Sequence, residues 1–394
     1  IEKFAPELNA KIITGNANDR RELIADRAGY DVMITSYDLL KRDIDEYENI
    51  DFFCQVIDEA QYIKNHTTQV SRAVKEICAG FKLALTGTPV ENRLSELHSI
   101  FEYLMPGFLY SYKRFRNEIE VPVVQENDEN VMKRLQKIIG PFVLRRLKKD
   151  VLKELPDKLE KCMYIQMDDE QQRLYDAHAK RLKMQLENST DSEFISGKLQ
   201  VLSELTKLRQ ICCNPLLLYD DYKGGAAKLE VCLDMISEAV ENGHKILMFS
   251  QFTTMFAYIQ EGLDKRGIKY YTLTGTTKKE KRIELVERFN TDDVPVFCIS
   301  LKAGGTGLNL TAADIVIHYD PWWNIAVENQ ATDRAHRIGQ KNVVNVYKLI
   351  TKGTIEENII RLQDKKRELA DNILGGESGM SGNFSREELI EILK

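Results

Sequence analysis

The chain has 394 residues, of which 43% are hydrophobic and 29% charged, and its formal net charge is -6 at pH 7. These proportions are typical of a soluble globular protein, and no apolar run is long enough to span a membrane, so we expect no membrane partner. The length predicts at least two domains, and the negative charge means that any DNA binding depends on local basic surfaces.

The first part of the chain alternates short apolar segments with polar helical ones. We expect strands at 11–14, 31–35, 52–57 and 82–85, with a helix at 19–28. Short strands separated by helices indicate parallel βαβ units rather than hairpins. Residues 1–104 are therefore predicted to form part of a doubly wound α/β lobe. Because the chain opens on Ile1 without a secretory signal pattern, we expect its natural start to lie upstream.

Helical patterns dominate the middle of the chain, especially at 170–188 and 197–213. We therefore predict that residues 105–228 form a helical protrusion and linker, with a hinge at Gly224 and Gly225, where the backbone bends at low cost.

A second set of strands and helices follows. Strands are expected at 245–249, 269–273, 295–300 and 314–320, and helices at 252–267 and 278–290. Residues 229–370 are thus predicted to be a second doubly wound α/β lobe. The last stretch, 371–394, is predicted to be a flexible segment and a final helix.

Two acidic residues, Asp58 and Glu59, directly follow the strand at 52–57. The carboxyl edge of a parallel sheet is where such folds bind ligands. A carboxylate there can hold Mg²⁺ through its water shell, and its neighbour can orient or deprotonate an attacking water. The alternative is a pair of acids favoured only by a helix dipole.

Two turns after strands carry further candidates. Thr86, Gly87 and Thr88 follow the strand at 82–85, where their hydroxyls can pass hydrogen bonds between a nucleotide site and a neighbouring surface. The glycine-rich loop at 301–310 can present backbone N–H groups to phosphates. Either turn can instead be a plain connection between a strand and a helix.

Gln330, Arg334 and Arg337 are spaced i, i+4 and i+7. On a helix this spacing places all three on one face, where two guanidinium groups can reach a phosphate. The alternative is a solvated face on which Asp333 pairs with Arg337. An exposed pair of that kind contributes only about 0.3 to 0.5 kcal/mol, whereas an arginine finger changes phosphoryl-transfer rates by roughly 10³ to 10⁵.

Six motifs occur in a characteristic order: DEAQ, LTGTPVEN, KILMFSQF, SLKAGGTGLNL, HYDPWWN and ENQATDRAHRIGQ. With them the chain resembles the Swi/Snf-type ATPases of the superfamily-two helicases, and the lack of a long insertion in the second lobe favours a bacterial or archaeal member. The resemblance implies two RecA-like lobes, with ATP in the cleft between them and double-stranded DNA across their surface. It also implies a monomeric translocase that acts on an unidentified DNA-bound protein, in the cytoplasm or nucleoid of a prokaryote or the nucleus of a eukaryote.

The resemblance also implies roles for individual residues. Asp58 and Glu59 serve Mg²⁺ and water activation, Thr86, Gly87 and Thr88 couple the nucleotide to DNA, and Arg334 and Arg337 approach the γ-phosphate. Gly305 and Gln330 join them in binding the nucleotide. The residues implied in DNA binding are Thr35, Ser36, Lys302, Gly304, Thr306 and Asn309. Trp322 and Trp323 either support the DNA-facing loop or stack on a base, and the basic run Arg145, Arg146, Lys148 and Lys149 either touches phosphates or is a solvated face.

Two features depart from the family pattern. Ile325 stands where the family usually has proline, and no G-x-x-x-x-G-K-[ST] phosphate loop occurs, so we expect that loop upstream of Ile1 and no ATPase activity from residues 1–394 alone. Two alternatives stay open: a helicase that separates strands, and a non-catalytic DNA-binding fragment.

Overall fold

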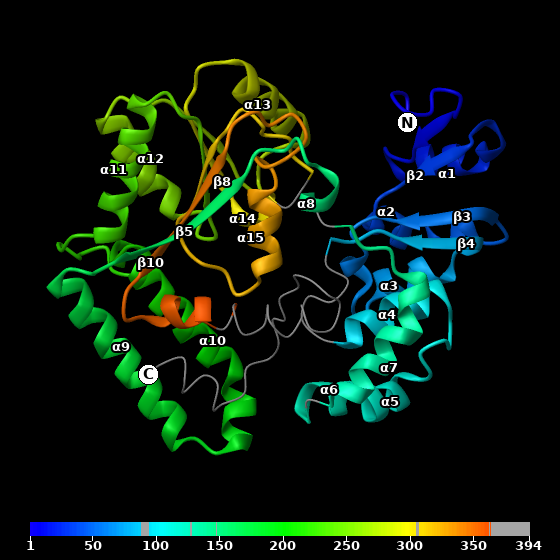
Figure 1. The fold of residues 1–394 in the computed structure, drawn as a ribbon, viewed down its shortest axis with the longest axis horizontal. Coiled ribbons are helices and arrows are strands. Elements are labelled where there is room, and N and C mark those ends of the chain that lie inside the picture. The colour runs from blue at the N-terminus through cyan, green and yellow to red at the C-terminus, as the bar shows by residue number, and fades with distance from the viewer. Residues whose placement is uncertain (88–93, 127, 147, 305–306, 362, 364–394) are drawn as a thin grey trace. The chain divides into compact units, whose positions relative to one another are not determined.

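The computed structural model describes residues 1–87, 94–126, 128–146, 148–304, 307–361 and 363. They form two compact units that divide between Val143 and Leu144 (Figure 1). Both units combine helices with parallel strands, which confirms the predicted α/β class. Within the described ranges, no helix has both the length and the hydropathy that a membrane span requires.

The first unit contains two parallel strand pairs. β1 (Ala10–Ile12) pairs with β2 (Val32–Ile34), and β3 (Asp51–Ile57) pairs with β4 (Cys78–Ala84). The helices along these strands are α1 (Ala17–Ala25), α2 (Tyr37–Arg42), α3 (Gln69–Glu76) and α4 (Leu94–Leu104). The start of α1 is fixed by a capping box between Asn16 and Asp19. The predicted βαβ pattern of this region is therefore present.

Helices continue to the end of the first unit. They are α5 (Tyr112–Phe115), a π-helical turn (Arg116–Glu120), α6 (Val121–Gln125) and α7 (Glu129–Ile139). Phe115, Ile119, Leu135 and Ile139 are buried here, so these short helices share an apolar interior. The predicted protrusion is helical at this point and belongs to the first unit.

The second unit is built on a six-stranded parallel sheet in the order β5-β10-β9-β6-β8-β7. The strands are β5 (Lys158–Ile165), β6 (Ile246–Ser250), β7 (Tyr270–Leu273), β8 (Val296–Ser300), β9 (Ile315–His318) and β10 (Val344–Thr351). Four of them were predicted from their apolar runs, and β5 and β10 were not. β5 lies at the edge of the sheet, where most of its side chains are exposed and a charged sequence is tolerated.

Helices cover both faces of this sheet. Along the fully buried β6, Ile246 and Met248 face α11 (Ala227–Glu241) and α12 (Met255–Lys265), while Leu247 and Phe249 face α13 (Lys279–Thr291) and α15 (Ile325–Thr332). A short α14 (Leu301–Gly304) follows β8. Side chains that point alternately into two apolar cores, one on each face, are typical of a doubly wound sheet.

Three more helices belong to the second unit: α8 (Lys148–Val151), α9 (Asp169–Asn188) and α10 (Asp191–Cys213). α9 and α10 share a buried core with Ile355 and Ile359, which follow β10. The expected hinge at Gly224 and Gly225 consequently lies inside this unit. A Cβ on Gly224 would stand 2.3 Å from the Tyr222 hydroxyl, so glycine permits a close approach there.

The final segment, 371–394, with its expected capping box and last helix, lies outside the described residues.

Candidate functional site

Asp58 and Glu59 stand at the carboxyl end of β3, as the sequence predicted. Asp58 is exposed, and one of its carboxylate oxygens accepts a 2.9 Å hydrogen bond from the Glu59 backbone N–H. Glu59 has φ 50° and ψ 56°, in the left-handed region that non-glycine residues seldom adopt. Such backbone strain concentrates at functional sites because the surrounding structure must hold it in place.

A short chain of hydrogen bonds runs from Glu59 to the turn that follows β4. The Gln61 amide, in the 3-10 helix Ala60–Ile63, donates to Glu59 Oε2 at 2.7 Å. The Thr86 hydroxyl donates to Gln61 Oε1 at 3.0 Å. Gln61 therefore joins the acidic pair to the Thr86 turn. Sequence analysis missed this role, although Gln61 stands within the DEAQ motif.

Backbone hydrogen bonds also join the two turns. Leu85 N–H donates to the Ile57 carbonyl at 2.8 Å, and Ala60 N–H donates to the Leu85 carbonyl at 2.9 Å. These bonds continue the β3-β4 pairing past the strand ends and bring the two turns side by side.

Tyr37, on α2, supports the turn that carries Asp58 and Glu59. The Tyr37 hydroxyl donates to the Asp58 carbonyl at 2.7 Å, and its ring stacks on Tyr62 with 5.3 Å between centroids. Burial, together with the charges of Asp58 and Glu59, raises the pKa of Tyr37 well above its usual value. The hydroxyl is thus a permanent donor at neutral pH.

The other predicted residues of the first unit are placed as follows. Thr35 is half-buried after β2, and the Ser36 hydroxyl caps α2 by accepting from Leu39 N–H at 3.4 Å. Gly87 follows Thr86 in the exposed turn, and Thr88 lies outside the described residues.

In the second unit, the helix expected to carry Gln330, Arg334 and Arg337 ends early. α15 stops at Thr332, so Gln330 is helical and half-buried while both arginines lie in the turns that follow. The prediction of one helical face is therefore wrong for the arginines. The Arg334 carbonyl accepts from Leu310 N–H at 3.0 Å, which ties this segment to the loop after α14.

The two arginines differ in exposure. Arg334 is buried, and its Nε donates to the Gly304 carbonyl at 3.0 Å. Arg337 is exposed, and its Nη1 donates to the Leu308 carbonyl at 3.2 Å. Both side chains thus lie along the loop that follows β8.

Asp333 does not form the alternative pair with Arg337. Its carboxylate lies 2.5 Å from Lys148 Nζ, and Lys148 also donates to the His336 carbonyl at 3.3 Å. The His336 ring is in turn hydrogen-bonded to the Pro156 carbonyl at 2.7 Å. Lys148, from the predicted basic run, is therefore anchored beside the arginine segment.

The predicted DNA-facing loop of the second unit is partly described. Lys302 and Asn309 are exposed, whereas Gly304 is buried against Phe249, which would lie 2.8 Å from a Cβ at that position. Gly304 therefore permits close packing under the loop. Gly305 and Thr306 lie outside the described residues.

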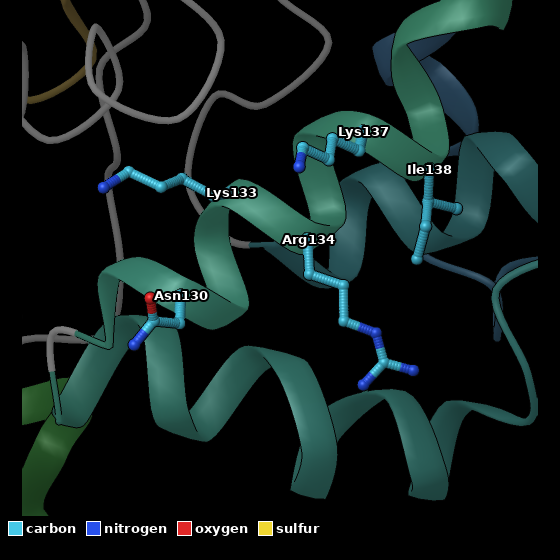
Figure 2. A pocket seen from close by; sticks show the side chains of 5 residues that line it. All are labelled: Asn130, Lys133, Arg134, Lys137 and Ile138. Carbon is cyan, nitrogen blue, oxygen red and sulfur yellow. The ribbon is translucent and has the colours of Figure 1, made fainter.

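A hollow of about 480 Å³ lies on α7 of the first unit (Figure 2). Asn130, Lys133, Arg134, Lys137 and Ile138 line it, and Lys133 pairs with Glu129 at 3.1 Å. None of the residues that the sequence singles out for nucleotide or DNA binding lines this hollow.

Two known protein families match this chain. Residues 1–217 match the SNF2-related domain, and residues 227–339 match the helicase conserved C-terminal domain. The chain belongs to the SNF2-related family. The SNF2-related match contains Asp58, Glu59 and Gln61, and the helicase C-terminal match contains both arginines.

Similar proteins extend over the whole chain. An uncharacterized ATP-dependent helicase of Mycoplasma pneumoniae is 38% identical over 100% of the chain and 37% of its own length. The chromatin-remodeling complex ATPase ISW1 of Saccharomyces cerevisiae is 32% identical over 94% of the chain and 34% of its own length. The SNF2-related chain thus spans little more than a third of these relatives.

A solved structure supports the same fold. The Sulfolobus solfataricus SWI2/SNF2 ATPase core domain is 36% identical, with a TM-score of 0.50, over 99% of this chain and 80% of that one. The predicted family and fold class are confirmed by these matches.

Proposed function

We propose that the full-length gene product is an ATP-dependent translocase that moves along double-stranded DNA and remodels DNA-bound protein. In this proposal Glu59 activates the attacking water, while Arg334 and Arg337 stabilise charge on the γ-phosphate. Gly305 and Gln330 contribute to nucleotide binding. The names of the relatives, a helicase and a chromatin-remodeling ATPase, agree with an ATP-driven activity on DNA.

The observation that supports this proposal most directly is the hydrogen-bonded chain from Glu59 through Gln61 to Thr86. It gives the water-activating carboxylate a fixed orientation and a physical link to the turn that we assign to coupling. Movement of that turn on DNA binding would change the hydrogen bonding of the carboxylate. We therefore assign Thr86, Gly87 and Thr88 to coupling.

The exposed Asp58 carboxylate fits a role in holding Mg²⁺, because this hard cation takes oxygen ligands and keeps several waters. Mg²⁺ held there would supply charge neutralisation on the β- and γ-phosphates. The chain itself fixes the carboxylate through the Glu59 N–H, and holds the backbone carbonyl of Asp58 through the Tyr37 hydroxyl.

DNA contact is assigned to residues at the ends of strands. We propose that Thr35 and Ser36 in the first unit, and Lys302, Gly304, Thr306 and Asn309 in the second, contact one strand through its phosphates. Such contacts make binding sensitive to salt and nearly independent of base sequence.

The test is ATP turnover by the full-length gene product with and without duplex DNA. Glu59→Gln should lower turnover by roughly 10²- to 10⁴-fold, as loss of a general base does, and Arg337→Ala by roughly 10³- to 10⁵-fold, as loss of an arginine finger does. Unchanged turnover in both variants would refute the assigned roles. Displacement of a third strand from a DNA triplex, without separation of a duplex, would distinguish translocation from helicase action.

Residues 1–394 contain no G-x-x-x-x-G-K-[ST] sequence, and we propose that they do not hydrolyse ATP by themselves. DNA-stimulated hydrolysis by the purified 394-residue chain would contradict this part of the proposal.

A further inference from the structure

Arg209 is a buried cation in the last turns of α10. Its side chain is 2% exposed, and its neighbours Leu208 and Ile211 belong to the apolar core between α9 and α10. Burying a guanidinium group is costly unless charged and polar partners replace its water. The partners of Arg209 therefore indicate which parts of the structure this side chain holds together.

The partners of Arg209 come from the carboxyl ends of two adjacent strands. Its Nη1 donates to Gln251 Oε1 at 2.8 Å, just after β6. Its Nη2 donates to the Asp320 carboxylate at 3.2 Å and to the Pro321 carbonyl at 2.7 Å, just after β9. One helix is thus fastened to the sheet edge by three hydrogen bonds from a single side chain.

Asp320 is fixed from the other side as well. Its Oδ1 accepts from the Ser250 hydroxyl at 2.6 Å and from Gln251 N–H at 3.1 Å. Burial raises the pKa of Asp320, and the positive charge of Arg209 opposes that rise. Arg209 is the nearer of two cations, with Lys228, whose charge favours the ionised form of this buried carboxylate.

Aromatic rings enclose the guanidinium group. Its central carbon lies 5.3 Å from the rings of Phe252 and Trp322 and 5.9 Å from that of Trp323, within the range of cation–π attraction. Trp322 packs on the sheet core, whereas Trp323 packs on the core of α9 and α10. These are the two tryptophans of the sequence, so tryptophan fluorescence of the chain reports on this turn alone.

The turn held by Arg209, residues 320–324, continues directly into α15. Trp322 N–H donates to Glu328 Oε1 at 2.5 Å, and the Trp322 carbonyl accepts from Gln363. Asn324 then caps the helix by accepting from Ala326 N–H at 3.0 Å. The turn therefore sets where α15 begins, and Arg334 follows two residues after that helix ends.

We propose that Arg209 is a positioning residue for ATP hydrolysis: it holds the turn 320–324, from which α15 places Arg334 and Arg337. This inference rests on the proposed function, in which those two arginines act on the γ-phosphate. It predicts an effect on kcat rather than on the KM for ATP, because misplaced arginines lose contacts that are strongest in the transition state.

The test compares Arg209→Lys with Lys207→Met, a variant of an exposed cation on the same helix. Arg209→Lys keeps the charge opposite Asp320 but loses the planar fork that reaches several acceptors at once. In the 394-residue chain, its tryptophan emission should shift to the red and be quenched more readily by iodide, while far-ultraviolet circular dichroism stays unchanged. Lys207→Met should behave like the wild type in each measurement.

In the full-length product, Arg209→Lys should lower DNA-stimulated kcat by at least about tenfold, since small misplacements of catalytic groups have effects of this size or larger. The KM for ATP should change less than twofold, and the same substitution placed in an Arg337→Ala background should lower kcat little further. Wild-type turnover in Arg209→Lys, or an equal further loss in the Arg337→Ala background, would overturn the positioning role. A wild-type protein without ATP hydrolysis would instead refute the proposed function on which that role depends.

Discussion

Replacing Gln61 by methionine should weaken the stimulation of ATP hydrolysis by DNA. Methionine has a similar length, but it can neither donate to Glu59 nor accept from Thr86, and these two bonds are 2.7 and 3.0 Å long. We take the loss of the neutral bond from Thr86, about 0.5 to 1.5 kcal/mol, as the measure of the coupling that this chain carries. We therefore expect DNA stimulation to fall by a factor of roughly 2 to 13, with a central value of about 5.

The assay measures kcat of the full-length product at saturating ATP, with and without duplex DNA. Thr86→Val removes the same bond from its other end, so it should lower the stimulation by a similar factor, and the double variant should be no worse than either single one. Tyr62→Phe is the control, because it alters the next residue along while keeping the ring that stacks on Tyr37. Stimulation unchanged in Gln61→Met, or additive losses in the double variant, would refute the coupling role of this chain.

Three further predictions concern stability and are measured by urea unfolding of the 394-residue chain. Burial lowers the pKa of His318 to about 4, so the unfolded chain takes up a proton between pH 6.5 and 4 that the folded protein does not, and stability falls as the pH falls through this window. Between pH 7 and 5 the wild type should lose about 2 kcal/mol more than His318→Gln, and equal losses would contradict this. Glu59→Gly should be about 1 kcal/mol more stable than Glu59→Ala, because only glycine relieves the left-handed backbone, and equal stabilities would show that the turn is unstrained. Lys228→Met should cost about 3 to 5 kcal/mol, because it leaves the buried Glu356 carboxylate without its cation, and adding Glu356→Leu should recover part of that loss.

The fold could be predicted wherever a strand is buried on both faces. Three of the four predicted strands of the second unit, β6, β8 and β9, are continuous runs buried on both faces, such as Ile246–Ser250, as strands inside a parallel sheet are. The fourth, β7, lies at the sheet edge and was predicted from its aromatic and β-branched residues. β10 escaped prediction because it carries polar residues, among them Lys348. That lysine is buried between two carboxylates on other elements, Glu328 on α15 at 3.2 Å and Glu160 on β5 at 3.8 Å. A strand whose polarity is neutralised by another element cannot be identified from its own residues.

The candidate site shows the same division. Asp58 and Glu59 were placed correctly because a strand and its carboxyl edge are local features. The arginines were assigned to one helical face because their spacing fits a helix, yet the helix ends at Thr332 and the Arg334 carbonyl is bonded to Leu310 N–H, far away in sequence. Arg209 was overlooked because a single arginine between apolar helix positions usually extends to solvent. Its only signal was its place directly after Leu208 and two residues before Ile211, in a stretch that also holds the polar residues Lys207 and Gln210.

The two halves of the proposed site are therefore held by different kinds of structure. Glu59 is fixed by contacts within about thirty residues of chain, through its strained backbone, Gln61 and Thr86. The arginine segment depends on contacts between residues far apart in sequence, of which the bond from Arg209 to Pro321 is one. Substitutions that affect the first half should thus lie close to Glu59 in sequence. Substitutions that affect the second half can lie more than a hundred residues away from the arginines, within helices that carry no recognisable sequence motif.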